Sequence, residues 1–243
     1  MTVLFAETPQ ATYGTQFYTS IDGSVTRDTT AARDPLGLSS WKCDGGAGAV
    51  ALLEKTSLSN PARVSAYFYF SQFPTTVAAI LGHNSYLHVQ VRSTGVLQLI
   101  NISTQVGSDG STLSLNTLYR ISLVTDNGTT AKVFLEGNQD ISGSTSGILF
   151  GDVRFGWVGN PDANKIVNFC HAYVDNDTSL TDPVGTGYGL YVTAKLPAAV
   201  NNNQYTTTGG TGAVNERALS ETNYMAELGK TQYLQDYTLQ TAA

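Results

Sequence analysis

The chain has 243 residues, enough to bury a large core, and only 13% of them are charged, about half the usual fraction of a soluble domain. A formal net charge of -6, with no cluster of Lys and Arg, excludes the basic patch typical of nucleic-acid-binding proteins. No apolar run reaches the roughly 20 residues of a membrane span, and the first residues lack the basic start and apolar stretch of a signal peptide. We therefore expect a protein that folds in a cytoplasm, with no nucleic-acid partner and no membrane insertion.

Short apolar runs recur along the first part of the chain at the length of β-strands. TQFYTSI (15–21) and GAGAVALLE (46–54) are the first two. RVSAYFYF (63–70) is apolar on both faces, which predicts a strand inside a layered sandwich, and a further strand is expected at 77–81. In residues 87–92, Leu and Val alternate with polar residues, as in a strand with one wet face.

The middle of the chain reads as consecutive hairpins. Residues 96–101 follow a Ser-Thr-Gly turn as the partner of 87–92. Strands at 119–123 and 131–135 flank an Asn127-Gly128 pair, which predicts a tight turn with positive φ at both central residues.

Two later strands, at 153–158 and 166–174, complete the set. Roughly seven to ten short strands with frequent turn signals predict an all-β, two-sheet antiparallel sandwich. We assign the sandwich domain to residues 1–195, and a polar linker plus C-terminal arm to residues 196–243.

The stretch FCHAYVDNDTS (169–179) carries the densest set of reactive side chains. Successive residues of a regular strand face opposite sides, so Cys170 and His171 are not expected to form a nucleophile and base pair. An EF-hand calcium loop starting at Asp175 would need Gly where Leu180 stands, so the acidic residues are interpreted as turn formers. We therefore expect no tightly bound metal, with Asp175 and Asp177 as weak candidate ligands, and the sequence predicts no cofactor.

Other motifs favour structure over catalysis. Cys43 and Cys170 are expected to be free and unreactive in a reducing compartment. CDGGAGAV (43–50) lacks the Lys of a phosphate-binding loop. The aromatic residues 67–70 suit core packing, with a sugar-stacking platform as the alternative.

The carboxylates do not form the paired motif of a glycosidase. The six glutamates, none of which sits in a strand motif of that kind, are Glu7, Glu54, Glu136, Glu216, Glu221 and Glu227. We therefore expect no hydrolase activity and no enzyme.

The C-terminal arm combines a polar tether with an apolar end. NNNQYTTTGGTG (201–212) has too few apolar side chains to fold alone. The large side chains beyond it, which we predict to contact a partner subunit, are Tyr224, Met225, Leu228, Tyr233, Leu234 and Tyr237. Docking on the chain's own sandwich is the alternative.

Taken in order, residues 12–195 resemble the concanavalin A-like, or laminin-G-like, jelly-roll domains. The resemblance rests on SSWKCDGGAGAVAL, YLHVQVRSTGVLQLI and LNTLYRISLVTDNGTTAKVFLEG. The tail, with Val214-Asn215-Glu216 followed by Thr222-Asn223-Tyr224, is similar to the segment after the jelly roll in tailed-bacteriophage structural proteins.

The resemblance implies a virion component made in the host cytoplasm: a capsid decoration protein, a head fibre or a tail accessory. Its partners would be other virion proteins, such as capsid or tail subunits. The chain itself would form a homo-oligomer. The alternative function is a carbohydrate-binding module that contacts a host surface glycan. Exposed aromatic residues on the concave face of the sandwich would favour the carbohydrate-binding function, and an ordered C-terminal arm lying on another subunit would favour the virion function.

Overall fold

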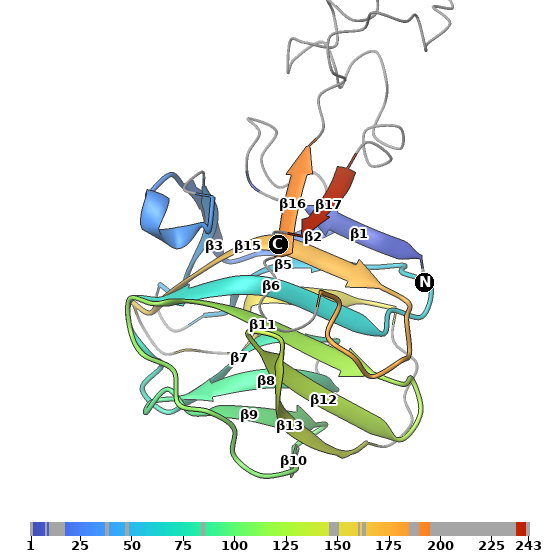
Figure 1. Cartoon of the computed structure of the whole chain (residues 1–243). Helices are drawn as coiled ribbons and strands as arrows, with labels where there is room; N and C mark the ends of the chain where they lie inside the picture. Colours follow the sequence, from blue (N-terminus) through green and yellow to red (C-terminus); the bar gives the residue numbers. More distant parts are fainter. Residues whose placement is uncertain are drawn as a thin grey trace, which may run out of the picture.

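Two antiparallel β-sheets pack face to face and form a sandwich, as the sequence predicts (Figure 1). The computed structural model describes residues 2–7, 9, 18–36, 39–46, 49–83, 86–145, 151–159, 161, 164–184, 190–194 and 237–241, the last two ranges and Ala31 by their backbone alone. A single 3-10 turn, η1 (Ala31–Arg33), interrupts the strands of this described part. Among the described residues there is no helix with the length and apolar character that a membrane span requires.

Sheet A contains the longest strands. Its order is β13 (Asn138–Ser144), β12 (Thr130–Leu135), β11 (Leu118–Thr125), β6 (Arg63–Phe70), β15 (Ile166–Asp175), β4 (Ser40–Asp44) and β3 (Ser24–Asp28). β1 (Val3–Glu7) also pairs with β15: β4 occupies the first half of that edge and β1 the second. β15 therefore lies at the centre of the sheet with three partner strands.

Sheet B faces sheet A across the core. Its order is β10 (Thr104–Val106), β9 (Leu97–Asn101), β8 (Leu87–Arg92), β7 (Val77–His83), β14 (Val153–Trp157), β5 (Ala51–Lys55) and β2 (Ser20–Asp22). A separate two-stranded ribbon pairs β16 (Leu190–Ala194) with β17 (Tyr237–Thr241) and projects at the top of Figure 1. The last strand of the predicted arm thus pairs within its own chain.

Alternation on the strands builds one apolar core between the sheets. On β6, Val64, Phe68 and Phe70 are fully buried and face sheet B. Phe155 and Phe169 stack at a centroid distance of 5.5 Å and join β14 to β15 across the core. Because each large buried side chain contributes about 1.5–3 kcal/mol, this aromatic layer is a major part of the folding free energy.

Most of the predicted strands are found with small changes in length, but two strands and one turn differ. The strand predicted at 46–54 begins only at Ala51, and the first three residues of the one predicted at 15–21 lie outside the described residues. β8 has the bounds predicted from its alternation, Leu87–Arg92. The turn between β11 and β12 has positive φ at Asn127, at 55°, and not at Gly128. Asp126 Oδ1 accepts hydrogen bonds from the N–H groups of Gly128 and Thr130, so a side chain organises this longer turn.

The outer face of sheet A is covered by two connecting segments, residues 31–36 and 176–184. Asp182 in the second segment reaches Arg120 on β11 at 2.5 Å. Arg33 in the first lies over the ring of Tyr69, 5.3 Å from its centroid. This cover explains why all eight residues of β6 are buried, although only half of them face the core.

Candidate functional site

A pocket of about 320 Å³ opens on the outer face of sheet B. Its lining residues come from β2, from β5 and the residue before it, and from β14 and the residue after it: Ser20, Ile21, Asp22, Val50, Leu52, Glu54, Arg154 and Val158. We call this group the sheet B pocket. It combines residues from three segments that are far apart in the sequence.

Strand alternation directs the polar lining residues outward. On β5, Leu53 is fully buried in the core, so Leu52 and Glu54 on either side of it face out. On β14, Phe155 is buried in the same core and Arg154 faces out. The register pairs Arg154 with Glu54 and Glu54 with Ser20, which places three polar side chains in one row across adjacent strands.

An ion pair fixes the polar wall of the pocket. Arg154 Nε donates to Glu54 Oε1 at 2.7 Å, and Ser20 Oγ donates to Glu54 Oε2 at 2.9 Å. The side chains of Arg154 and Glu54 are 26% and 16% exposed. Within the part of the chain that the structure describes, the two Nη groups of Arg154 have no protein partner, so this guanidinium presents donors to the pocket.

The remaining lining residues add an apolar surface and a second acceptor. Val50, Leu52 and Val158 are aliphatic, and Asp22 is an exposed carboxylate. A ligand in the pocket would therefore meet hydrogen-bond donors, acceptors and an apolar surface together, which is the usual composition of a small-molecule site.

The same outer face continues as a polar stripe over β8, β9 and β10. Gln90 Nε2 donates to Gln98 Oε1 at 2.9 Å, and Gln98 Nε2 donates to Gln105 Oε1 at 2.6 Å. Asp109 accepts from Gln98 at 2.8 Å and pairs with Arg92 at 3.1 Å. We call these residues the amide stripe.

The strand register connects the stripe to the pocket. Gly82 on β7 pairs with His88 of β8 on one side and with Arg154 of β14 on the other. A Cβ at Gly82 would lie 2.6 Å from His88 Cβ, so the glycine lets the neighbouring strand pack closely. The sheet B pocket and the amide stripe therefore lie on the same outer face of sheet B, with β7 between them.

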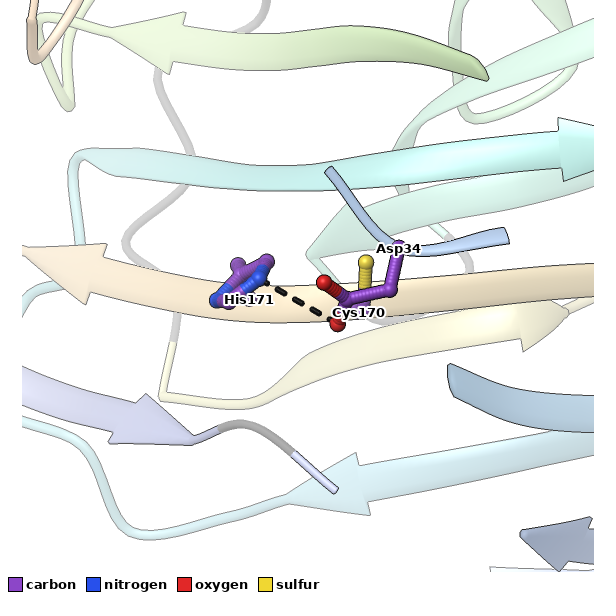
Figure 2. A group of neighbouring side chains, drawn as sticks. All are labelled: Asp34, Cys170 and His171. Atoms are coloured by element: carbon purple, nitrogen blue, oxygen red, sulfur yellow. Dashed lines mark ion pairs between the residues drawn. The ribbon is translucent and has the colours of Figure 1, made fainter. Parts of the chain in front are cut away.

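A second group of reactive side chains lies on the opposite side of the molecule, under the cover of sheet A. The ligating atoms of Asp34, Cys170 and His171 all lie within 4.8 Å of one another, and all three residues are buried (Figure 2). His171 Nε2 is 3.3 Å from Asp34 Oδ2. The sequence-based expectation that Cys170 and His171 face opposite sides is wrong.

The reason is a β-bulge in β15. Cys170 pairs with Tyr67 and Tyr173 pairs with Ser65, so two residues, His171 and Ala172, oppose a single residue of β6. His171 adopts φ 51°, in the left-handed region. Such a bulge places two consecutive side chains on the same face, which strict alternation forbids.

The environment of this cluster keeps the thiol unreactive. Burial, and then the neighbouring Asp34 carboxylate, raise the pKa of Cys170 well above its ordinary value. Burial also raises the pKa of Cys43 in the core. Both cysteines are free, as predicted, and neither is a thiolate nucleophile at neutral pH.

The two candidate metal ligands from the sequence are engaged by an arginine. Arg63 Nε donates to Asp175 Oδ1 at 2.9 Å, and Arg63 Nη2 donates to Asp175 Oδ2 at 2.6 Å. Asp177 lies 3.3 Å from the same guanidinium and accepts the N–H of Ser179. A guanidinium thus already fills the position that a cation would take between these carboxylates.

The predicted partner-binding residues fall mainly outside the described part of the chain. This applies to Tyr224, Met225, Leu228, Tyr233 and Leu234. Tyr237 begins β17, where its backbone pairs with Ala194. Their contact with a partner subunit stays a prediction.

Sequence reasoning missed most of the sheet B pocket. Glu54 was considered only as a catalytic carboxylate, while Ser20, Asp22 and Arg154 were not considered. The usable signal is the charged residues in two otherwise apolar strands, Glu54 and Lys55 in ALLEK and Arg154 in VRFGW. The sequence could not show that these strands are neighbours.

Among solved structures, this chain is similar to botulinum neurotoxins, and one receptor-binding domain among them shares the architecture. The receptor-binding domain of the C/D mosaic serotype gives a TM-score of 0.51 at 14% identity, over 72% of this chain and 48% of that one. Botulinum neurotoxin type C, which depends on interaction with two ganglioside molecules to enter cells, gives 0.48 at 13%, over 65% and 43%. The binding domain of neurotoxin DC in complex with SialylT gives 0.48 at 12%, over 65% and 42%.

The sandwich fold is what this chain shares with the receptor-binding domain of the C/D mosaic serotype. This chain spans less than half the length of each of the three structures. At such identities the likeness shows the fold alone. Neither a family model nor a curated protein matches the sequence.

Proposed function

We propose that the protein is a non-enzymatic carbohydrate-binding module, which holds a sugar unit of a cell-surface glycan in the sheet B pocket. The observation that carries the proposal is the pairing of Arg154 and Glu54 beside an aliphatic surface in one open pocket. This arrangement is fixed by strand register before any ligand arrives. Preorganisation of this kind lowers the entropic cost of binding.

Sugar chemistry matches the lining of the pocket. A pyranose ring has neighbouring hydroxyl groups that both donate and accept, and a face of C–H groups that packs on apolar side chains. Arg154 supplies donors, Asp22 supplies an acceptor, and Leu52 with Val50 supplies apolar surface. The volume of about 320 Å³ is at the lower end of small-molecule sites, which suits one or two sugar units.

The engagement of Glu54 favours binding over hydrolysis. Both of its oxygens already accept hydrogen bonds, one from Arg154 and one from Ser20. Retaining glycosidases need one carboxyl group to donate a proton and a second, roughly 5 Å away, to attack. Glu54 is held as an acceptor by Arg154 and Ser20, which leaves it poorly placed to donate a proton to a leaving group.

The fold is compatible with this function. A sandwich of the same architecture is a receptor-binding domain in the C/D mosaic neurotoxin. Fold alone does not assign a ligand, so the pocket chemistry decides the proposal. That the module is carried on a bacteriophage virion, as a capsid decoration, head fibre or tail accessory, is a part of the proposal that rests on the sequence resemblance alone.

The test is a glycan screen followed by calorimetry on matched variants. The full chain should bind a subset of host-surface oligosaccharides. Arg154→Ala should weaken binding by about 10- to 100-fold, because one charged hydrogen bond is worth about 1.5–3 kcal/mol. Arg92→Ala is the matched control: it removes an exposed arginine from the same face, outside the pocket, and should change affinity less than about twofold.

Two results would contradict the proposal. The first is equal loss of affinity in both arginine variants, which would show that net charge, not the pocket, attracts the ligand. The second is release of reducing sugar by the wild-type protein that Glu54→Gln abolishes, which would make the protein an enzyme.

A further inference from the structure

The buried cluster under the cover of sheet A is independent of the sheet B pocket, and it has the composition of a metal site. One carboxylate, one thiol and one imidazole converge from two segments that are distant in the sequence, β15 and the residue after η1 (Figure 2). The described part of the chain contains no other group of three potential ligands this close together. The sequence predicts no metal here, because Cys170 and His171 are expected on opposite faces and no spacing in the sequence marks a further ligand. The bulge brings the two side chains together and the fold supplies Asp34.

The distances between the three ligand atoms suit tetrahedral coordination of one ion, once the widest of them shortens slightly. Zinc bonds of about 2.0–2.3 Å to N, O and S place neighbouring ligand atoms roughly 3.3–3.8 Å apart. His171 Nε2 and Asp34 Oδ2 already lie 3.3 Å apart, and the widest separation in the group is 4.8 Å at most. The main-chain oxygen of Arg33 lies 3.6 Å from Cys170 Sγ and borders the same space.

The remaining contacts orient two of the ligands. Asp34 Oδ1 accepts the N–H of Leu36 at 2.7 Å, which directs Oδ2 toward His171. The ring of His171 packs edge-on against Tyr67, at a centroid distance of 6.1 Å. Supporting contacts of this kind fix ligand orientation in known metal sites.

The charges also match a divalent ion. A thiolate, a carboxylate and a neutral imidazole together carry two negative charges, which a divalent cation neutralises. The side chains of Asp34 and His171 are both 0% exposed, so an uncompensated charge there would be costly. The basic side chain nearest to Asp34 in the sequence, that of Arg33, pairs with Asp28 and stacks on Tyr69.

The bulge itself points to a specific role. A non-glycine residue with φ near +50° costs about 1–3 kcal/mol, and such strain persists where the surrounding structure holds it. At His171 the strained backbone has one evident result: it turns the imidazole toward Asp34 and Cys170.

We infer that Asp34, Cys170 and His171 bind a single divalent transition-metal ion, of which zinc is the best match for this mixed ligand set. Binding replaces the thiol proton of Cys170, which leaves to solvent, by a sulfur–metal bond. No electron transfer is involved. The ion would tie the segment of residues 31–36 to the central strand of sheet A.

The test uses the full chain, and the metal is supplied before or during folding because all three ligands are buried in the folded protein. Protein produced in zinc-supplemented medium should contain one zinc ion per chain by elemental analysis. Refolding with Co²⁺ should give a thiolate-to-cobalt charge-transfer band. Free zinc at a concentration one hundred times its Kd should raise the Tm of the protein by roughly 5–10 °C, given the usual conversion from free energy to Tm for a chain of this size.

Matched variants locate the ion. Cys170→Ala and His171→Asn should both lose zinc and the cobalt band, and Asn tolerates the left-handed backbone at position 171. Cys43→Ala, which removes the other buried thiol, should keep both signals. Cys170→Ser is the conservative variant, should the alanine variant fold poorly, and it should also lose the cobalt band.

Two outcomes would overturn the inference. Wild-type protein that contains no zinc and gives no cobalt band after refolding would show that the cluster is a His171–Asp34 ion pair only. Retention of stoichiometric zinc in Cys170→Ala would show that the ion binds elsewhere.

Discussion

The outer faces of the two sheets differ in what lies over them. On sheet A, residues 31–36 and 176–184 cover the strands, and Arg63, Arg120 and Asp175 are almost completely buried. On sheet B, the ion pair of Arg92 with Asp109 is about 45% exposed on each side. Both faces are built by the same alternation, yet one is an interior layer and the other is a surface.

The difference shows that polarity alone does not decide which face can bind a ligand. The polar and charged side chains on the outer face of sheet A form hydrogen bonds and ion pairs with one another. The Ser122 hydroxyl is 2.8 Å from that of Ser65 and donates to Asp182 at 2.7 Å, and Asp182 pairs with Arg120. They hold the covering segment in place. The polar groups of sheet B leave donors and acceptors open to solvent, so that face is the one on which we place the glycan.

The largest effect is expected from removing a buried charge on sheet A. Arg120→Ala should lower the free energy of unfolding by about 3–5 kcal/mol, because it leaves Asp182 buried without its partner. Urea denaturation at neutral pH measures the change. If the free energy of unfolding fell by less than about 1 kcal/mol, the segment of residues 176–184 would open readily. The outer face of sheet A would then be no more buried in solution than that of sheet B.

The next effect concerns Glu7, which lies in the core between the two sheets. Burial raises the pKa of Glu7 from 4.5 to about 7, against the opposing hydrogen bonds from Trp41 Nε1 and Tyr18 Oη. The folded pKa is the higher one, so the contribution of this group is complete below pH 4.5 and is lost as the pH rises through 7. Glu7→Gln keeps the hydrogen-bond acceptor and removes this titration.

The stability of Glu7→Gln relative to wild type should therefore increase by about 3 kcal/mol between pH 4.5 and pH 8. Parallel urea titrations at several pH values give this difference directly, and Cys43→Ala serves as a core control without a titrating group in this range. A difference that stays constant across pH would mean that Glu7 is ionised in the folded protein.

The smallest effect is expected on the open face. Arg92→Ala should change the free energy of unfolding by less than about 1 kcal/mol, because exposed ion pairs are weak and screened by salt. Denaturation at low and at high ionic strength measures the contribution of the ion pair to stability and its screening by salt. A loss comparable to that of Arg120→Ala would indicate that the amide stripe is covered by another part of the molecule.

Strand identity was predictable from sequence where one face is wet. Leu87–Arg92 was predicted with its final bounds because its polar residues face solvent and its apolar residues face the core. β6 was predicted as a strand buried on both faces, but the sequence did not show which segments cover it.

The two candidate sites could not be predicted for different reasons. The sheet B pocket depends on β5 and β14 being neighbours, which is a long-range pairing that local patterns do not encode. The cluster at Cys170 and His171 depends on a bulge at a histidine, without the glycine that usually marks a positive φ. A rule of strict alternation gave the wrong face at this one residue.

The central position of β15 also determines when sheet A can form during synthesis of the chain. β6, β4 and β1 all pair with this strand, yet it is synthesised after all three. The N-terminal Thr2 donates its N–H to Asn176, 174 residues later, so sheet A closes only when most of the sandwich has left the ribosome. Until then the edges of β4 and β6 are unpaired, which predicts slow folding and an early need for chaperone protection.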